Sequence, residues 1–175
     1  MIRAAFIDRD GVLNVKAPPH DYIKTPAVLQ LPPGAAEAVA RLNAAGVLAI
    51  VVTNQRGVAR GLMTAADVEA VHAELRRRLS AAGARLDAIY VCPHDDADGC
   101  DCRKPKPGLI RRGMSEFGLS AENCLLVGDS ASDVEAARAA GIGAIFIGEA
   151  PCPPGAVAAA NLSQAVDIIL SARSS

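Results

Sequence analysis

The feature that most constrains this chain is a regular alternation of short apolar runs with alanine-rich stretches of helical pattern. Runs short enough for buried strands lie at residues 4–7, 47–53, 88–92, 124–129 and 144–147. Segments with helical spacing and capping residues lie at residues 35–45, 64–82, 109–117, 131–140 and 164–172. This order predicts an α/β fold with a doubly wound parallel sheet and right-handed crossovers. We interpret the alanine- and proline-rich stretch 150–160 as a surface connection.

Length and composition limit the number of domains. The chain of 175 residues is long enough for one well-buried domain and short for two, so we expect a single domain over residues 1–175. Trp is absent and aromatic residues make up only 3% of the chain, so Ala, Val, Leu and Ile must build the core. Such a core suits buried parallel strands flanked by alanine-rich helices.

The charge pattern argues against a polyanionic partner. The formal net charge is -1, and Lys and Arg are spread along the chain, so we expect no nucleic-acid partner. The N-terminal apolar run is too short for a signal peptide, and no later run reaches membrane-spanning length. We therefore expect a cytoplasmic protein without a membrane partner. Because no hydrophobic stripe is left over, we also expect a monomer.

Polar residues stand where three of the predicted strands end. Asp8 and Asp10 follow the first strand, Thr53 and Asn54 end the second, and Asp129 ends the fourth. Ligands of open α/β sheets bind beyond the carboxyl ends of the strands, so these side chains should share one crevice. A carboxylate pair there can attack phosphorus and transfer the proton, with Mg²⁺ offsetting the repulsion of the phosphate. Taken singly, each residue also fits a solvated turn or a helix cap.

Four segments, in order along the chain, resemble the motifs of haloacid dehalogenase-type phosphatases. They are Asp8-Arg9-Asp10-Gly11-Val12-Leu13-Asn14, Val51-Val52-Thr53-Asn54-Gln55, Lys104-Pro105-Lys106-Pro107 and Val127-Gly128-Asp129-Ser130-Ala131-Ser132-Asp133. More narrowly, residues 53–61 and the cysteine loop at 92–105 resemble the heptose 1,7-bisphosphate phosphatases and their relatives, the histidinol-phosphatase domains. The resemblance spans residues 4–147. It implies a Mg²⁺-dependent phosphatase that forms an aspartyl-phosphate intermediate on a small phosphorylated sugar.

The resemblance also implies a role for each matching catalytic residue. Asp8 matches the nucleophile and Asp10 the general acid and base. Thr53 matches the hydroxyl that binds the transferring phosphoryl group, Asn54 follows it as a substrate-orienting amide, and Lys104 matches the cation that offsets the phosphoryl charge.

The magnesium ligands implied by the same resemblance come from three positions. They are the Asp8 carboxylate, the Asp10 backbone carbonyl and Asp129. We expect Asp133 to support this site rather than to bind the metal directly.

A second metal site is expected in the loop after the third strand. Cys92, His94, Cys100 and Cys102 supply three thiolates and an imidazole, a sufficient set for a closed tetrahedral Zn²⁺ site. Because a filled shell leaves no place for substrate, we assign the zinc a structural role in pinning the loop that presents Arg103 and Lys104. The competing interpretation is a set of free thiols in a polar loop. We expect Cys124 to lie in the core, and Cys152 not to bind metal.

Three arginines are candidate ligands of a second phosphate or another anionic part of the substrate. They are Arg56, Arg60 and Arg103, whose guanidinium groups suit phosphate oxygens. Arg56 and Arg60 also fit ordinary surface arginines. His20 and His72 read as ordinary surface or helix residues, and we assign them no function.

The spacing of the motifs leaves no room for a large cap domain. Only a loop fits between residues 11 and 34, and only one helix, one strand and the zinc loop fit between residues 55 and 103. We therefore expect an open site. The resemblance implies removal of the 7-phosphate from heptose 1,7-bisphosphate, a step in the synthesis of bacterial surface glycans such as lipopolysaccharide, and this is the function we expect. The alternatives are a histidinol-phosphate phosphatase and a non-catalytic zinc-stabilised binding module.

Overall fold

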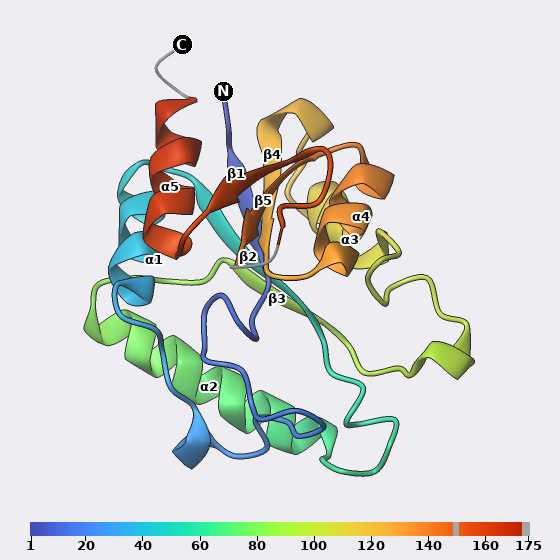
Figure 1. Ribbon diagram of the computed structural model, residues 1–175. Helices are drawn as coiled ribbons and strands as arrows, with labels where there is room; N and C mark the ends of the chain where they lie inside the picture. The colour runs from blue at the N-terminus through green and yellow to red at the C-terminus, as the bar shows by residue number, and fades with distance from the viewer. Residues whose placement is uncertain (149–150, 173–175) are drawn as a thin grey trace.

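A six-stranded parallel sheet forms the centre of the molecule in the computed structural model, which describes residues 1–148 and 151–172 (Figure 1). The strands stand in the order β3-β2-β1-β4-β5-β6. Their bounds are β1 Ala4–Ile7, β2 Leu48–Asn54, β3 Ala88–Cys92, β4 Cys124–Gly128, β5 Gly143–Ile147 and β6 Ala156–Ala159. The order reverses beside β1, which pairs with β2 on one side and β4 on the other. This is the switch point at which open α/β sheets bind their ligands.

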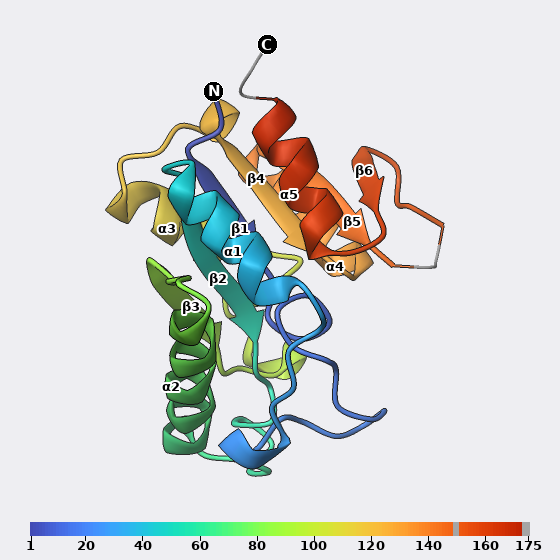
Figure 2. The same ribbon diagram turned by 90° about the vertical axis from the view of Figure 1, so that its left-hand side faces the viewer.

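Helices cover both faces of the sheet, as doubly wound folds require. The bounds are α1 Ala35–Ala44, α2 Ala65–Ala81, α3 Gly108–Glu116, α4 Ala131–Ala140 and α5 Leu162–Ser171. One core cluster joins the sheet to α1, α2 and α5, and the other joins it to α3 and α4. Figure 2 shows α1 and α5 side by side over the first of these faces.

The side chains of β1 contribute alternately to the two core clusters on opposite faces of the sheet. Ala5 and Ile7 belong to the cluster under α1, α2 and α5, whereas Ala4 and Phe6 belong to the cluster under α3 and α4. Successive strand side chains point to opposite faces, and all four are fully buried. The predicted α/β fold with a doubly wound parallel sheet is confirmed.

Capping residues place the ends of α2 and α4 where the sequence predicted them, whereas α5 begins at Leu162, two residues before its expected start. The Thr64 side chain accepts from the backbone N–H of Asp67 and begins α2, and Ser130 begins α4 through the same capping box with Asp133. Gly141 ends α4 in the left-handed region at φ 79°.

One part of the predicted fold is wrong. The stretch 150–160 was expected to be a surface connection, but its last residues form β6 at the edge of the sheet, parallel to β5. An edge strand pairs on one side only, so its residues need no continuous apolar run, and Val157 is exposed. Residue 150 of this stretch lies outside the described residues.

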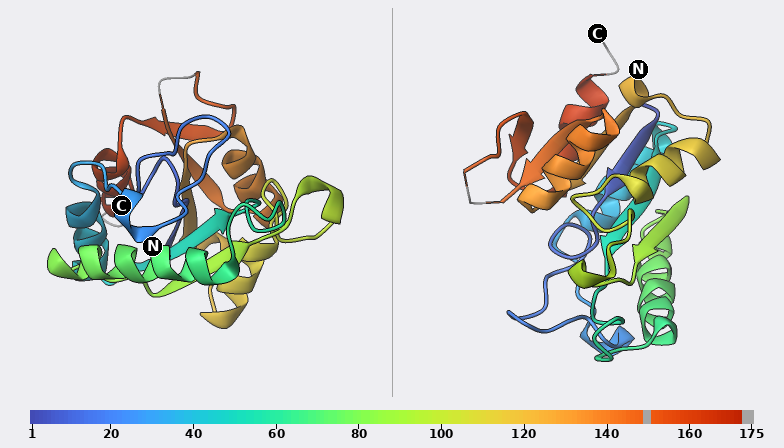
Figure 3. Two further views of the ribbon diagram at one scale, coloured as in Figure 1. Left: turned by 90° about the horizontal axis from the view of Figure 1, so that it is seen from below. Right: turned by 90° about the vertical axis from the view of Figure 1, so that its right-hand side faces the viewer.

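The carboxyl ends of the strands carry the long loops, and Figure 3 (left) looks onto this edge from below. After β1 the chain runs through a loop with one short 3-10 helix, Pro26–Val28, before α1 begins. The described part of the chain contains no folded insertion that could serve as a cap, as predicted. Within the same residues, every helix is too short or too polar to cross a membrane.

Candidate active site

Three strand ends bring most of the predicted polar residues to one crevice, whereas Thr53 is fully buried and does not line it. Asp8 directly follows β1, and its N–H donates to Val127 O of the neighbouring β4 at 2.9 Å. Asp129 follows β4 on one side of Asp8, and Asn54 ends β2 on the other. These three residues line an open cavity of about 150 Å³ together with Asp10, Lys16, Lys104, Ser130 and Ser132.

Lys104 lies at the base of this cavity between two carboxylates. Its Nζ is 2.8 Å from Asp8 Oδ1 and 2.6 Å from Asp133 Oδ1, and it donates to Val52 O at 2.9 Å. Burial raises the pKa of Asp8 to about 7, although the Lys104 charge works against this shift. Burial alone would lower the pKa of Lys104, but the two carboxylates outweigh it and raise that pKa. The ammonium therefore stays charged beside the nucleophile position.

Asp133 connects helix α4 to this ion cluster. Its Oδ2 accepts from Ser130 Oγ at 2.6 Å and from Ser130 N at 3.1 Å, while its Oδ1 pairs with Lys104. Gly128 makes room for it, because a Cβ at that position would lie 2.3 Å from the Cβ of Asp133. Asp133 thus joins the helix cap to Lys104.

Three donors hold the carboxylate of Asp10. Arg9 Nη2 lies 3.0 Å from both of its oxygens, Asn14 Nδ2 donates at 3.0 Å and Gln55 Nε2 donates at 2.8 Å. Burial opposes ionisation, but the Arg9 charge and these hydrogen bonds outweigh it and lower the pKa of Asp10. The resting group is an oriented carboxylate.

Thr53 and Asn54 are held by their neighbours. The Thr53 hydroxyl is buried and accepts from Gln55 Nε2 at 2.9 Å. Asn54 pairs with the backbone of Lys104 in both directions, since its Nδ2 donates to Lys104 O at 3.0 Å and its Oδ1 accepts from Lys104 N at 3.1 Å. In this structure Asn54 therefore fixes the loop that carries Lys104.

The acidic side chains next to this cavity fit a divalent cation. Asp8, Asp129 and Asp133 each offer an oxygen within 4.8 Å of the others, and Asp129 Oδ1 is buried without a hydrogen-bond partner. A Cβ on Gly11 would lie 1.9 Å from Asp129 Oδ2, so the chain just after Asp10 passes directly over this carboxylate. Oxygen ligands of this kind suit Mg²⁺.

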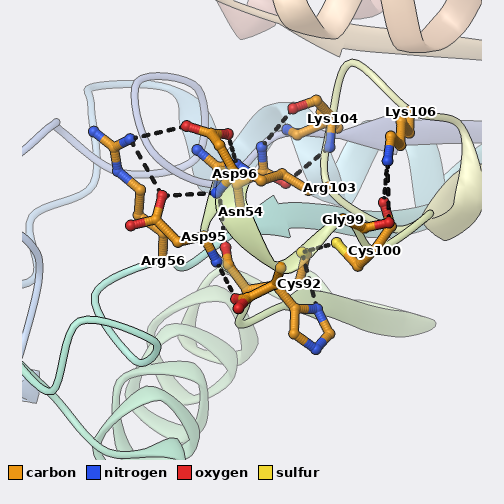
Figure 4. A network of polar contacts seen from close by, with 12 residues as sticks. Asn54, Arg56, Cys92, Asp95, Asp96, Gly99, Cys100, Arg103, Lys104 and Lys106 are labelled. Atoms are coloured by element: carbon orange, nitrogen blue, oxygen red, sulfur yellow. Dashed lines mark hydrogen bonds and ion pairs between the residues drawn. The ribbon is translucent and has the colours of Figure 1, made fainter.

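The cysteine loop forms a compact set of four ligand atoms. Figure 4 labels two of the residues that supply them, Cys92 and Cys100. His94 Nδ1 lies 3.6 Å from Cys92 Sγ and 3.3 Å from Cys102 Sγ, and Cys92 Sγ lies 3.7 Å from Cys100 Sγ. A tetrahedral Zn²⁺ site has edges of about 3.8 Å between sulfurs and about 3.6 Å between sulfur and nitrogen. The set therefore fits zinc. Cys124 is buried in the core, as predicted.

The three candidate arginines converge on two aspartates that follow His94. Figure 4 shows Arg56 and Arg103 beside these aspartates. Arg103 Nε lies 2.6 Å from Asp96 Oδ1, and Arg60 Nε lies 2.6 Å from Asp95 Oδ2. Arg56 Nη1 reaches both, at 3.7 Å from Asp95 and 3.4 Å from Asp96. The arginines thus lie beside the zinc loop with their charges already partnered.

Sequence reasoning missed several members of the site. Lys16, in the loop after β1, pairs with Asp129 at 2.5 Å. Arg9 is fully buried, and His72, expected to be an ordinary surface or helix residue, is buried on α2 against it. The apolar residues around His72 at helical spacing were the available signal that it faces inward.

A family model described as haloacid dehalogenase-like hydrolase matches residues 2–141. The D-glycero-beta-D-manno-heptose-1,7-bisphosphate 7-phosphatase of Pseudomonas aeruginosa is 47% identical over 133 residues, which are 76% of this chain and 74% of that protein. The D-glycero-alpha-D-manno-heptose-1,7-bisphosphate 7-phosphatase of Mycobacterium tuberculosis is 43% identical over 138 residues, 76% of this chain and 70% of that protein. The crystal structure of the D,D-heptose 1,7-bisphosphate phosphatase of B. bronchiseptica, complexed with magnesium and phosphate, covers 98% of this chain and 99% of its own, with a TM-score of 0.90 and 32% identity.

Proposed function

The chain belongs to the haloacid dehalogenase-like hydrolases and, among them, to the heptose-1,7-bisphosphate 7-phosphatases, and from this premise we propose that it hydrolyses the 7-phosphate of D-glycero-D-manno-heptose 1,7-bisphosphate in a Mg²⁺-dependent reaction. The observation that carries the proposal is the crevice in which Asp8 and Asp10 meet Lys104 at the carboxyl ends of the strands. A charged lysine beside a buried carboxylate suits phosphoryl transfer, in which positioning and charge stabilisation do most of the work.

We propose that Asp8 attacks phosphorus and that Asp10 transfers the proton. Bond formation to Asp8 breaks the bond to the sugar oxygen, and Asp10 protonates that oxygen as it leaves. Asp10 then takes a proton from water, which attacks the aspartyl phosphate and releases inorganic phosphate. The resting carboxylate of Asp10 gains its proton as the phosphate enters, because a nearby negative charge raises the pKa of a carboxyl group.

The other catalytic residues act on charge and orientation. Lys104 offsets the negative charge that builds on the phosphoryl oxygens, and Thr53 hydrogen-bonds the same group. Mg²⁺, held by Asp8, the Asp10 backbone carbonyl and Asp129, would supply a Lewis acid for the phosphoryl oxygens. Asp133 supports the site through its contact with Lys104.

The sugar is proposed to lie in the larger cavity next to the nucleophile. This cavity of about 420 Å³ is lined by Asp10, Asn54, Arg56 and the loop residues 16–23. Its position in the lining of this cavity supports the proposal that Arg56 binds an anionic part of the substrate. Arg103, next to Lys104, and Arg60 are proposed to assist it, in exchange for their contacts with Asp95 and Asp96.

The deciding experiment is phosphate release with Mg²⁺ from the α and β anomers of heptose 1,7-bisphosphate, with histidinol phosphate beside them. Relatives of both anomeric kinds match this chain, so both anomers are needed. We expect the heptose substrates to be turned over far faster than histidinol phosphate. The opposite preference would assign the chain to the histidinol phosphatases, and no release from any substrate would leave a zinc-stabilised binding module.

The covalent step has its own test. Asp8→Asn should abolish turnover while the protein stays folded, and Asp167→Asn, an exposed aspartate on α5, should leave turnover unchanged. Retained activity in Asp8→Asn would rule out the aspartyl-phosphate mechanism.

Three further proposals concern the protein as a whole. We propose a single domain, because two core clusters share one continuous sheet. We propose a monomer because, of the five large exposed apolar residues described, only Val15 and Val28 share a cavity, and Met1, Leu62 and Val157 come from other segments; sedimentation velocity tests this. We propose a cytoplasmic location, because the zinc site needs three reduced thiols.

A further inference from the structure

Arg9 stands between the two motif aspartates in the sequence, yet its side chain is fully buried. Its Nη2 holds both oxygens of Asp10 at 3.0 Å, and its Nη1 faces His72 Nε2 at 3.0 Å. Its Nε is buried without a hydrogen-bond partner. Burial of a guanidinium group is costly unless its charge and donors are satisfied, so these two contacts decide where the group lies.

His72 comes from a distant part of the chain, on helix α2. It is 1% exposed and lies on the buried face of that helix with Val68, Val71 and Leu75. Arginine can only donate hydrogen bonds, so His72 Nε2 must accept, and the neutral imidazole then carries its proton on Nδ1. Burial, helped by the Arg9 charge, lowers the pKa of His72 to about 3, which agrees with a neutral ring.

We infer that His72 is a positioning residue of the phosphatase reaction, which fixes the Arg9 guanidinium and through it the carboxylate of Asp10. The inference rests on the proposed function, in which Asp10 protonates the leaving oxygen. A guanidinium group is planar, so a contact at Nη1 sets the direction in which Nη2 points. Without the imidazole, Nη1 loses its acceptor, and the plane can turn away from Asp10.

Loss of the His72 imidazole should reduce acid catalysis by Asp10 only in part, because two neutral donors still hold the Asp10 carboxylate. Asn14 and Gln55 still hold the carboxylate at 3.0 and 2.8 Å, but Arg9 is the only cation that contacts it among the described residues. General acid catalysis contributes about 10²- to 10⁴-fold, and small misplacements of such groups cost up to about 10²-fold. Loss of His72 should therefore cost about 10- to 100-fold in the step that needs the acid.

The leaving group of the substrate separates this role from a purely structural one. Heptose bisphosphate releases a sugar alkoxide, which needs the proton from Asp10, whereas 2,4-dinitrophenyl phosphate releases a stable phenolate that needs none. His72→Ala should lower kcat/KM for heptose bisphosphate about 10- to 100-fold and that for the aryl phosphate less than about threefold. His72→Gln, whose amide oxygen can accept from Arg9, should recover much of the loss.

A matched control comes from the same helix face. Leu75 is fully buried beside His72 and has no polar atom for Arg9, so Leu75→Ala should destabilise the protein and change kcat/KM equally for the two substrates. An equal loss for both substrates in His72→Ala would overturn the inference. If the wild type hydrolyses neither phosphate ester, the proposed phosphatase function is wrong. The NMR measurement described next would still test the hydrogen bond between Arg9 and His72.

The tautomer of His72 can be read without any turnover. The chain has 3 histidines, so long-range ¹H–¹⁵N spectra of the wild type and of His72→Gln identify the His72 signals. We expect an unprotonated Nε2 and a protonated Nδ1 at pH 7. A proton on Nε2 would face the Arg9 donor and would rule out the hydrogen bond on which the inference depends.

Discussion

Replacing Lys104 by methionine should destabilise the folded protein substantially, because it leaves buried carboxylates without their cation. The Lys104 side chain is 3% exposed and pairs with Asp8 and Asp133, whose side chains are 12% and 0% exposed. Removal of one partner from a buried ion pair typically costs about 3–5 kcal/mol. Asp8 can relieve part of this cost by protonation, since burial already raises its pKa to about 7 with the lysine in place. We therefore expect a loss near the lower end, about 3 kcal/mol.

The loss should depend on pH in a defined direction. The pKa of folded Asp8, about 7, lies above the unfolded value of about 3.9. At pH 8 Asp8 is charged and paired in the wild type, so Lys104→Met loses this attraction. At pH 5.5 folded Asp8 is protonated in both proteins, so its share of the difference disappears. The gap in unfolding free energy between wild type and variant should narrow from pH 8 to pH 5.5.

Urea unfolding followed by circular dichroism measures this gap. The buffer should lack Mg²⁺, which could replace the missing charge, and should contain no chelator, which could remove zinc. Lys24→Met removes an exposed ion pair with Asp21 and should change stability by less than about 1 kcal/mol. Adding Asp133→Asn to Lys104→Met should restore part of the stability, although Asp133→Asn alone destabilises. Additive losses in the double variant, or a gap independent of pH, would refute the reasoning.

Two further predictions concern the metal sites. Elemental analysis should find about one zinc per chain, absent in Cys102→Ser and retained in Cys152→Ser, whereas a stable zinc-free wild type would contradict the assignment. Gly11→Ala should raise the Mg²⁺ concentration for half-maximal activity at least about tenfold, because its Cβ would lie 1.9 Å from Asp129 Oδ2. Gly61→Ala is the control, because Gly61 also has a positive φ, 66° against 92° for Gly11, but a Cβ there would meet no atom within 4 Å. This variant should therefore share the backbone strain and keep the wild-type Mg²⁺ requirement. An equal rise in the Mg²⁺ requirement of both variants would show that strain alone is responsible.

Much of the fold could be predicted because its signals are local. Helix α4 shows this, since Ser130 and Gly141 mark its two ends in the sequence and in the structure. Strand β6 could not be predicted in the same way. It is four residues long, follows two prolines and a glycine, and gains its order from pairing with β5 rather than from its own pattern.

The candidate site also contains residues that could be predicted from the sequence and residues that could not. Asp8, Asn54 and Asp129 could be placed together from sequence, because parallel strands deliver their carboxyl ends to one edge. Arg9 and His72 could not, since their contact joins positions 63 residues apart and depends on how α2 packs under the loop after β1. An arginine between two aspartates reads as solvated. Only the tertiary structure shows that it is buried.

The charges around the crevice explain why metal and phosphate should bind together. The cluster contains four carboxylates and three cations, which are Asp8, Asp10, Asp129 and Asp133 against Arg9, Lys16 and Lys104. With every group ionised its net charge is therefore -1, so a phosphate dianion alone would bring it to -3 at a partly buried position, where charge is costly. A divalent cation first makes it +1, and phosphate then returns it to -1. Burial raises the pKa of Asp129 while Lys16 opposes that shift, so a cation that displaces Lys16 from this carboxylate would free the ammonium for the incoming phosphate. The Lys16 charge thus favours the ionised form of Asp129, which is the form that would hold a metal.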